Sequence, residues 1–376
     1  MAESLKNDDK SIRSYILNDV HEKVPIDKSY ENLCKLIGND AIAFYDFQFW
    51  YYRFLSGKQD LDFDRSSDPE PLQFSDLPVD AVGLIVNKLE IVERLMLRRV
   101  SRALREFMEK QEFDCNCIEV TFNDGHIDMT YGIGEEYGED DVYGDDCVSV
   151  VCNDLACVLK NPKLQLRIFD FWPNQGYEAE VLSTFYTKFE CVLRSLNHQI
   201  AVRELVLRPE RPDNFLAILP YLKPGYLEDI TIYYTIGSYD WKSDESIRKM
   251  EQILQLDQWK QANHLCLHDS LDLFPDEVFL QFKTYWFDSS TFNRSQLDRI
   301  RMKFAASPVF EYCHVSTQDP SDDGNFIDFI GVPGPIIGYY RSVRHYMIPN
   351  TDKLLVFTEH LDGDIEIQKK TRADVE

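Results

Sequence analysis

The chain has 376 residues and a formal net charge of −25 at pH 7, from 65 acidic and 40 basic side chains. Its length exceeds the usual size of a single hydrophobic core, so we expect two or more modules. The negative charge argues against binding to nucleic-acid phosphates or to an anionic membrane surface, because lysine and arginine drive both interactions.

The cysteines and the N-terminus indicate the compartment. Nine cysteines are odd in number and scattered, which is not typical of a secreted disulfide framework. The N-terminal sequence MAESLKNDDK begins with charges, and no apolar run reaches the roughly 18 residues of a membrane span. We therefore expect a soluble protein of a reducing compartment, cytoplasmic, nuclear or both.

Residues 11–56 are predicted to form short helices, the last of which is rich in aromatic side chains. This helix lies in the stretch AIAFYDFQFWYYRFLSGK. Gly57 suits a C-terminal helix cap, because glycine adopts the left-handed conformation without strain. The next segment, QDLDFDRSSDPEP, is acidic, polar and contains proline, which is typical of a linker.

A second helical region runs from Phe74 to about Lys110, and its first helix is apolar on more than one side. Pro78 suits the first helical position, where a backbone N–H would have no partner. From Val79 onward the apolar side chains cover an arc of about 220°, whereas one core needs only about half of that. Such a helix is either buried inside a large domain or shared between its own domain and a partner chain.

After this region the pattern changes to alternation, as in CIEVTFNDGHIDMTY. Short strands are predicted in LQLRIFDFW (164–172), VRELVLRPE (202–210), LEDITIYYT (227–235), NHLCLHDSL (263–271), FKTYWFDSS (282–290) and VFEYCHVST (309–317). Helical stretches separate several of them, such as EVLSTFYTKFECVLRSL, DNFLAILPYL, SIRKMEQILQLDQW and FNRSQLDRIRMKFAAS. The spacing of the strands favours an irregular leucine-rich-repeat-like β/α solenoid over a doubly wound α/β domain, the competing architecture.

Some residues could bind a metal ion. His264, Cys266 and His268 alternate on a predicted strand and would share one face, as zinc ligands could. No fourth ligand is evident, so a solvent-facing row of side chains is the simpler interpretation. Cys115 and Cys117 lack the spacing of a zinc ribbon and are better explained as small buried side chains.

Two charged features each have two interpretations. The stretch GIGEEYGEDDVYGDD (132–146) is too acidic for a phosphate loop and does not keep the ligand order of an EF-hand. It is either a mobile, solvated loop or a surface that captures a basic partner segment. A local basic stripe either pairs within the molecule or lies at an interface with an adaptor or a neighbouring domain. Its members are Arg94, Arg98, Arg99, Arg102 and Arg105.

No catalytic signature is present. The sequence contains no serine elbow, no P-loop, and no carboxylate pair or Cys/His set at motif spacing. We therefore expect a protein that is not an enzyme and that has no cofactor and no metal site.

The stretch LPVDAVGLIVNKLEIVERLMLRRVSRALREF (77–107) resembles the F-box. The resemblance rests on Leu-Pro at its start, on aliphatic residues at the expected spacings and on the Val-Ser-Arg segment that begins at Val100. Leu104 stands where F-boxes commonly carry tryptophan. The resemblance implies that one face of these helices packs within the F-box while the other docks on a Skp-family adaptor, which joins it to a cullin ubiquitin ligase.

Residues 12–69 are similar to the helix-turn-helix module of mariner-type transposases, which has an aromatic-rich helix followed by a Phe-x-Ser-Gly turn. The order of this module, an F-box and a β/α region ending near LLVFTEH is similar to the FTH-type F-box proteins that are expanded in nematodes. We therefore predict an α+β chain with three domains. They are a helix-turn-helix module at 11–66, an F-box at 74–110, and an FTH or β/α repeat domain for substrate recognition at 115–362.

The helix-turn-helix module is not expected to bind DNA. Between Ser11 and Arg65, seven Lys or Arg residues face nine Asp or Glu residues. A duplex binder needs cations on its recognition helix. Here that helix, if it is 41–55, offers Arg53 against Asp46, so a structural or partner-docking role is favoured.

The resemblance implies a substrate-recruiting adaptor that acts by proximity, with a Skp-family adaptor, a cullin ligase and an unknown target protein as partners. The predicted docking and F-box core set is Leu77, Pro78, Val82, Ile85, Leu89, Ile91 and Leu95. Strand residues that alternate with buried positions are predicted to bind the target; a register slip of one residue would invert the set. They are Glu204, Val206, Arg208, Asp229, Thr231, Tyr233, His264, Cys266, His268, Thr284 and Trp286.

Two other functions stay open. A regulatory F-box protein could bind RNA, or more consistently with the acidity an RNA-binding protein, without degrading its partner. Alternatively, the chain is a transposon-derived interaction module with a vestigial F-box. Binding to the adaptor distinguishes the ligase adaptor from a module with a vestigial F-box. Turnover of the target distinguishes it from a regulatory F-box protein.

Overall fold

The computed structural model describes residues 8–38, 42–65, 76–133, 136–174, 176–234, 239–269, 271–289, 292–317, 326–336 and 340–375. Much of the predicted linker, residues 66–71, and the first two residues of the predicted F-box lie outside this set. The chain divides into two compact units, residues 1–82 and 83–376, and the boundary falls inside one helix, α5.

The first unit contains a three-helix module: α2 (Asp9–His21), α3 (Ile26–Ile37) and α4 (Phe44–Leu55). Half of its core is aromatic, because Phe47, Trp50, Tyr51 and Phe54 of α4 pack against aliphatic side chains of α2 and α3. The helix α4 ends at Leu55, and Gly57 follows with a φ of +85°. The prediction of Gly57 as a helix cap is therefore confirmed.

Three helices follow in the predicted F-box region. They are α5 (Val79–Val86), α6 (Ile91–Val100) and α7 (Arg102–Met108). Glu90 and Glu93 form a capping box at the start of α6. The side chain of Ser101 accepts a hydrogen bond from the backbone N–H of Leu104, which caps α7. The Val-Ser-Arg segment is thus the junction between two helices.

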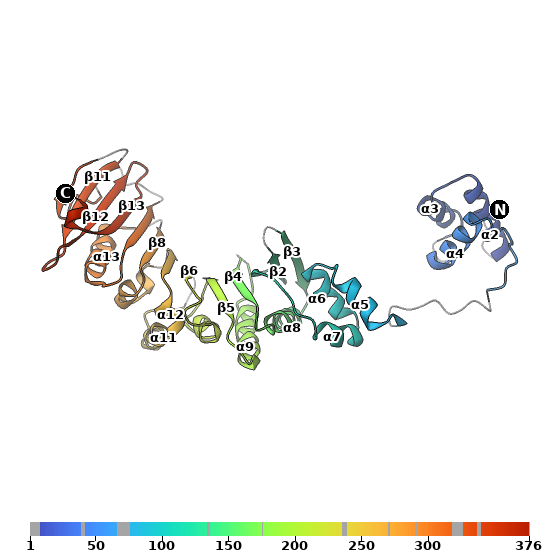
Figure 1. Ribbon diagram of the computed structural model, residues 1–376, viewed down its shortest axis with the longest axis horizontal. Coiled ribbons are helices and arrows are strands. Elements are labelled where there is room, and N and C mark those ends of the chain that lie inside the picture. The colour runs from blue at the N-terminus through green and yellow to red at the C-terminus, as the bar shows by residue number, and fades with distance from the viewer. Residues whose placement is uncertain are drawn as a thin grey trace. The chain divides into compact units, whose positions relative to one another are not determined.

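Among the described residues, thirteen strands form one mixed sheet in the order β10-β11-β12-β13-β9-β8-β7-β6-β5-β4-β1-β2-β3 (Figure 1). The strands are β1 (Cys117–Asn123), β2 (His126–Ile133), β3 (Glu136–Tyr143), β4 (Gln165–Pro173), β5 (Ala201–Leu207), β6 (Asp229–Tyr233), β7 (His264–His268), β8 (Thr284–Ser289), β9 (Tyr312–Thr317), β10 (Val332–Pro333), β11 (Tyr340–Met347), β12 (Lys353–His360) and β13 (Ile365–Thr371).

The strands β4 to β9 are parallel, and each pairs with the next strand in the sequence. The six predicted strands are all present here. A doubly wound sheet reverses its strand order at a switch point, and these strands show no reversal. Antiparallel pairs flank them, with β2 and β3 beyond β1 on one side and β10 to β13 on the other. The leucine-rich-repeat interpretation did not include these flanks and stays an interpretation.

The connecting helices are α8 (Cys147–Leu159), α9 (Ala179–Ser195), α10 (Asp213–Leu216), α11 (Asp244–Gln255), α12 (Asp257–Gln261) and α13 (Arg294–Ala306), with short 3₁₀ turns at Leu219–Tyr221, Leu271–Leu273, Asp276–Leu280 and Arg372–Asp374. In Figure 1, α8, α9, α11 and α12 lie along one side of the parallel strands. Strand burial agrees, because every second side chain is buried and those between stay partly accessible. The helices therefore cover one face of the sheet.

The acidic stretch 132–146 differs from its predicted loop. Most of its described residues form strand β3, which pairs with β2 in an antiparallel hairpin. Asp140 and Val142 are buried, whereas Tyr137, Glu139 and Asp141 of the same strand are exposed. The interpretation as a mobile loop is wrong. Asp140 pairs with Arg99 of α6, and Val142 is buried on the covered side of the sheet.

Candidate functional site

The uncovered side of the sheet, here called the open face, gathers the predicted target-binding residues. Because paired residues of neighbouring strands point to the same side, the strand register defines three rows. The first row is Ile168, Glu204, Asp229, His264, Thr284 and Tyr312. The second is Asp170, Val206, Thr231, Cys266, Trp286 and His314. The third is Tyr233, His268, Asp288 and Ser316.

Every residue of the predicted target-binding set except Arg208 lies in these rows, and Arg208 follows the last residue of β5. The structure thus brings the set together on one face. Binding of a target by these residues stays a prediction.

A depression of about 440 Å³ lies in the first two rows, with Glu204, Asp229, His264, Trp286 and Tyr312 in its lining. Burial raises the pKa of the Glu204 carboxyl, and the charge of Asp229 raises it further. Burial also raises the pKa of Asp229, against the opposing effect of His264. The depression therefore presents two carboxyl groups whose negative charges are unfavourable as long as no cation lies between them.

An arginine is stacked between aromatic rings beside the depression. The guanidinium of Arg208 lies over the ring of Trp172 and 4.8 Å from the ring centroid of Tyr233. Tyr233 in turn stacks on His268, with ring centroids 4.0 Å apart. Burial lowers the pKa of Arg208 to about 10, and its Nε has no hydrogen-bond partner within the described chain. Cation–π contact thus takes the place of hydrogen bonds here.

Asp170 is the most perturbed carboxyl group of the open face. Burial raises its pKa to about 7, with a further contribution from Glu119 and an opposing one from Arg208. Its Oδ1 accepts no hydrogen bond from the residues described. Asp170 and Trp172 were not selected from the sequence, although they alternate with buried residues in the predicted strand LQLRIFDFW. That alternation is the signal that could have found them.

The possible zinc ligands do share one face, as alternation predicted. Cys266 Sγ lies 3.3 Å from His268 Nε2, and His268 Nδ1 lies 3.1 Å from Asp288 Oδ2. Burial raises the pKa of Cys266 to about 12, which disfavours the thiolate that zinc requires. Across the described ranges, no three His, Cys, Asp or Glu side chains are arranged to hold a metal ion.

The predicted adaptor-binding set separates into buried and accessible members. Val82, Ile91 and Leu95 are buried, and Leu77 and Leu89 are partly buried. These side chains therefore offer little accessible surface. The exposed members of the set are Pro78 and Ile85.

Other large apolar side chains of α5 and α6 are more exposed than Ile85. The exposed fraction is 69% for Val79, 70% for Leu84, 46% for Met96 and 72% for Val100. The sequence did not identify them as surface residues, because on a helix with a wide apolar arc an apolar residue cannot be assigned to the buried or to the exposed side. The wide apolar arc was the signal, and the structure shows which part of it stays uncovered.

The arginines of α6 pair within the molecule. Arg98 Nη1 donates to Asp154 Oδ1 at 2.9 Å, and Arg99 Nη2 donates to Asp140 Oδ2 at 2.5 Å and also to Asp154. Asp154 comes from α8 and Asp140 from β3, so these ion pairs tie α6 to the sheet. Burial raises the pKa of Asp154 against the opposing effect of Arg99 and Arg98. For Arg98 and Arg99, the pairing is therefore intramolecular, and it lies where the predicted F-box meets the predicted β/α domain.

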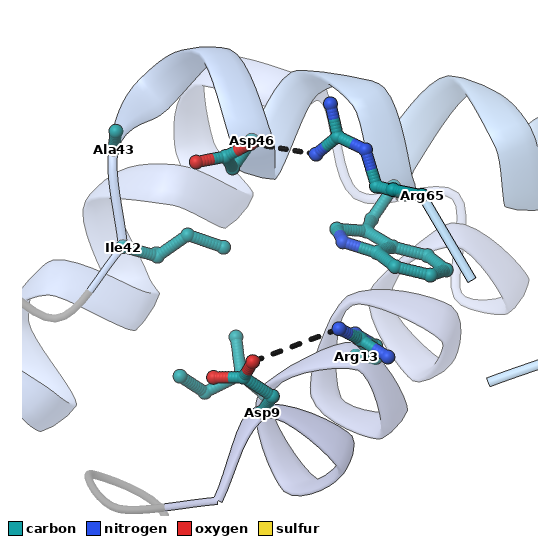
Figure 2. A pocket seen from close by; sticks show the side chains of 8 residues that line it. Asp9, Arg13, Ile42, Ala43, Asp46 and Arg65 are labelled. Carbon is teal, nitrogen blue, oxygen red and sulfur yellow. Dashed lines mark hydrogen bonds and ion pairs between the residues drawn. The ribbon is translucent and has the colours of Figure 1, made fainter. Parts of the chain in front are cut away.

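The N-terminal module has a cavity of about 370 Å³ between two ion pairs (Figure 2). Figure 2 shows Arg13 beside Asp9 and Arg65 beside Asp46, with N–O distances of 3.6 Å and 2.6 Å. Arg13 also lies over the ring of Trp50, with 4.2 Å between its Cζ and the ring centroid. Both arginines thus already interact inside the module.

The helix α4, the predicted recognition helix, offers aromatic rings rather than cations. Arg53 lies over the Phe63 ring, with its Cζ 3.6 Å from the centroid. The exposed large side chains of α4 are Phe44, Tyr45, Tyr52 and Leu55. Such a surface offers few cations to displace counterions from DNA, and the expectation that this module does not bind DNA stays a prediction.

Three segments of the chain match known domain families. The FTH domain matches residues 183–329, the HTH domain in Mos1 transposase matches residues 10–58, and the F-box domain matches residues 74–116. The chain is similar to the F-box A protein 224 of Caenorhabditis elegans, with 27% identity over 348 residues, which cover 85% of this chain and 86% of that protein. No helix among the described residues is long and apolar enough to cross a membrane.

Proposed function

Because this chain carries the helix-turn-helix, F-box and FTH domains in the order of the FTH-type F-box proteins, and so belongs to that family, we propose that it recruits substrates to a Skp–cullin–F-box ubiquitin ligase. Its F-box docks on a Skp-family adaptor, and the open face of its sheet binds a target protein. The ligase supplies the chemistry, and this chain raises the local concentration of the target near the ubiquitin-charged enzyme. The chain itself is not an enzyme in this scheme.

The observation that carries the proposal is the exposure of large aliphatic side chains in the region that matches the F-box. Leu84 is 70% exposed and Ile85 is 42% exposed. Water contact with such groups costs free energy, about 25 cal/mol for each Å² of apolar surface. A protein–protein interface would remove this cost, and a few such side chains usually carry most of the binding energy.

The parallel strands support the recognition role. We interpret β4 to β9 and their helices as an irregular leucine-rich-repeat-like solenoid, since each strand pairs with its neighbour in sequence and the helices cover one face. In such an array the uncovered strand face is a broad surface that is held rigidly by the packed side. The polar and aromatic rows of the open face lie on this surface.

The ion pairs of α6 give the proposal a geometric basis. Arg98 and Arg99 bind Asp154 of α8, and α8 packs on α9, which follows β4. The helix that carries part of the F-box is therefore fastened to the sheet that would hold the target. A fixed orientation of this kind would set the direction in which the target faces the ligase.

The proposal also includes a place in the cell. All nine cysteines are free thiols, and six of them are buried. Free thiols are stable in a reducing compartment, so we place the protein in the cytoplasm, the nucleus or both.

Co-purification of the full chain with a Skp-family adaptor tests the function. The variant Leu84→Ala/Ile85→Ala removes exposed side chains and should keep the fold, while binding falls at least about tenfold. A matched control, Ile247→Ala/Met302→Ala, removes apolar side chains that are 46% and 52% exposed on α11 and α13. The control should bind as the wild type does.

Circular dichroism must show that both variants are folded. If the wild type does not bind the adaptor, the ligase function is wrong and the F-box is vestigial. If it binds but depletion of the protein leaves its bound target at the same abundance, the non-degradative, regulatory function takes its place, including one with an RNA-binding protein as the partner.

A further inference from the structure

We propose that the open face binds a basic, extended segment of the target protein, in which lysine or arginine side chains project toward the sheet. This inference rests on the proposed function, because it names the chemistry of the target that the adaptor would recruit. Three observations support it. The open face is negatively charged, aromatic rings lie between its carboxylates, and one arginine of the chain itself, Arg208, is stacked on aromatic rings there.

Carboxylate side chains continue across the open face beyond the three rows described above, onto β1, β2 and β3. Glu139 of β3 pairs through Thr130 of β2 with Glu119 of β1, and Glu119 pairs with Asp170 of β4. Asp141 of β3 lies opposite Asp128 of β2 in the neighbouring row. The acidic residues of the open face from β3 to β8 are Glu119, Asp128, Glu139, Asp141, Asp170, Glu204, Asp229 and Asp288.

Few cations offset these carboxylates. Arg208 is stacked on Trp172 and Tyr233, so it is engaged with aromatic rings. Arg203, close to Asp229, forms an ion pair with Glu228 at 2.9 Å. Arg167 approaches Glu204 from the start of β4. The face as a whole thus keeps a net negative charge.

The carboxylates also destabilise one another. Glu119 raises the pKa of Asp170, and Asp229 raises that of Glu204, in each case in addition to burial. A cation placed between two carboxylates would remove this repulsion. A nucleic acid would increase it, and so the segment that fits the face is a polypeptide with positive side chains.

Aromatic rings supply the second part of the recognition. Trp286 is 46% exposed and lines the depression together with Tyr312. Ring faces attract lysine and arginine, and arginine most often. The stack of Arg208 on Trp172 shows the same chemistry within the chain, and the depression beside it offers carboxylates and a ring to a second cation.

The spacing of the sheet sets the size of the segment. Neighbouring strands are about 4.8 Å apart, so the four steps from Asp170 on β4 to Asp288 on β8 span about 19 Å. An extended chain covers this distance with about six residues at about 3.3 Å per residue. Because alternate side chains of such a chain point the same way, a short run with lysine or arginine at every second position would meet the carboxylates.

A labelled synthetic peptide tests the inference with the purified full chain. The probe is a 12-residue peptide in which Arg and Ser alternate, and fluorescence anisotropy measures its binding at 0.15 M salt. We expect Glu204→Gln/Asp229→Asn to weaken binding about tenfold, which corresponds to about 1.4 kcal/mol for the two carboxylates together. The control Glu251→Gln/Glu277→Gln removes the same charge from exposed positions of α11 and a 3₁₀ turn and should change binding less than about twofold.

Trp286→Ala gives a measurement that does not change the net charge, and we expect it to weaken binding about fivefold. The inference is wrong if the wild type does not bind the peptide, or if both double variants weaken binding equally, which would indicate attraction by net charge alone. The same variants are also tested for co-purification with the Skp-family adaptor. If the wild type does not bind the adaptor, the proposed function is wrong. If the open-face variants selectively lose binding to the peptide, this inference is supported whatever the outcome of the adaptor test.

Discussion

The ion pairs between α6 and the sheet yield the sharpest stability prediction. The Asp154 side chain is 2% exposed and the Arg98 side chain is 11% exposed. Replacing Asp154 with alanine leaves the guanidinium groups of Arg98 and Arg99 without their shared carboxylate in a nearly dry environment. Removing one partner of a buried ion pair typically costs about 3–5 kcal/mol, because the remaining charge is buried and uncompensated.

This cost is large enough to measure by thermal unfolding. For a unit of this size we expect Asp154→Ala to lower Tm by about 6–10 °C. Tryptophan fluorescence is a suitable probe, because four of the five tryptophans, Trp172, Trp241, Trp259 and Trp286, belong to the unit that contains the ion pairs.

An exposed ion pair of the next helix is the matched control. Arg102 Nε lies 3.1 Å from Glu106 Oε1, and these side chains are 91% and 62% exposed. Arg102→Ala should cost less than about 1 kcal/mol, because water and salt screen exposed pairs. If Asp154→Ala destabilises the protein no more than Arg102→Ala does, the ion pairs do not fasten α6 to the sheet, and the argument for a fixed orientation fails.

Three further predictions concern single side chains. The pKa of Asp170 is about 7 in the folded protein against an ordinary 3.8, so ionisation of Asp170 lowers the stability of the fold as pH rises between these two values. The stabilisation by Asp170→Asn, measured by urea unfolding, should therefore grow by about 2–3 kcal/mol from pH 5 to pH 8. A stabilisation that stays constant with pH would refute this pKa assignment. A Cβ on Gly138 would lie 2.9 Å from Val92 Cγ2, so Gly138→Ala should destabilise the protein by about 1–3 kcal/mol. The additional change Val92→Ala should recover part of the lost stability, and no recovery would argue against the clash. Cys191 is exposed, whereas Cys34 and Cys266 are partly exposed and the other six cysteines are buried. A thiol reagent should therefore modify Cys191 fastest in the native protein, and Cys191→Ser should remove this fast phase. An unchanged fast phase would contradict the lower exposure of the other thiols.

Local patterns in the sequence were sufficient for the order and type of most elements. The alternation in LEDITIYYT placed Ile230 and Ile232 on the covered side and Thr231 on the open one, because a strand has a period of two. The same rule brought His264, Cys266 and His268 to one face. It held here because each parallel strand has helices on one side alone, so burial follows the period.

Other features depended on contacts between distant segments. The strand β3 forms from a stretch rich in acids because Asp140 meets Arg99 and Val142 packs on the covered side, and neither partner is near in sequence. For the same reason, the sequence alone did not divide the apolar positions of α5 and α6 between interior and surface. Leu95 is fully buried whereas Leu84 is 70% exposed, although both carry the same side chain.

The order of the matched segments, the helical and strand periods and the acidic character of the chain could be read from the sequence, because they depend on residue type and spacing alone. The pairing of the strands, the side of the sheet that the helices cover and the neutralisation of particular charges required the folded arrangement. Pairing and burial depend on groups that are far apart in the chain, so the open face, with its carboxylates and rings, became visible only when the strands were placed beside one another.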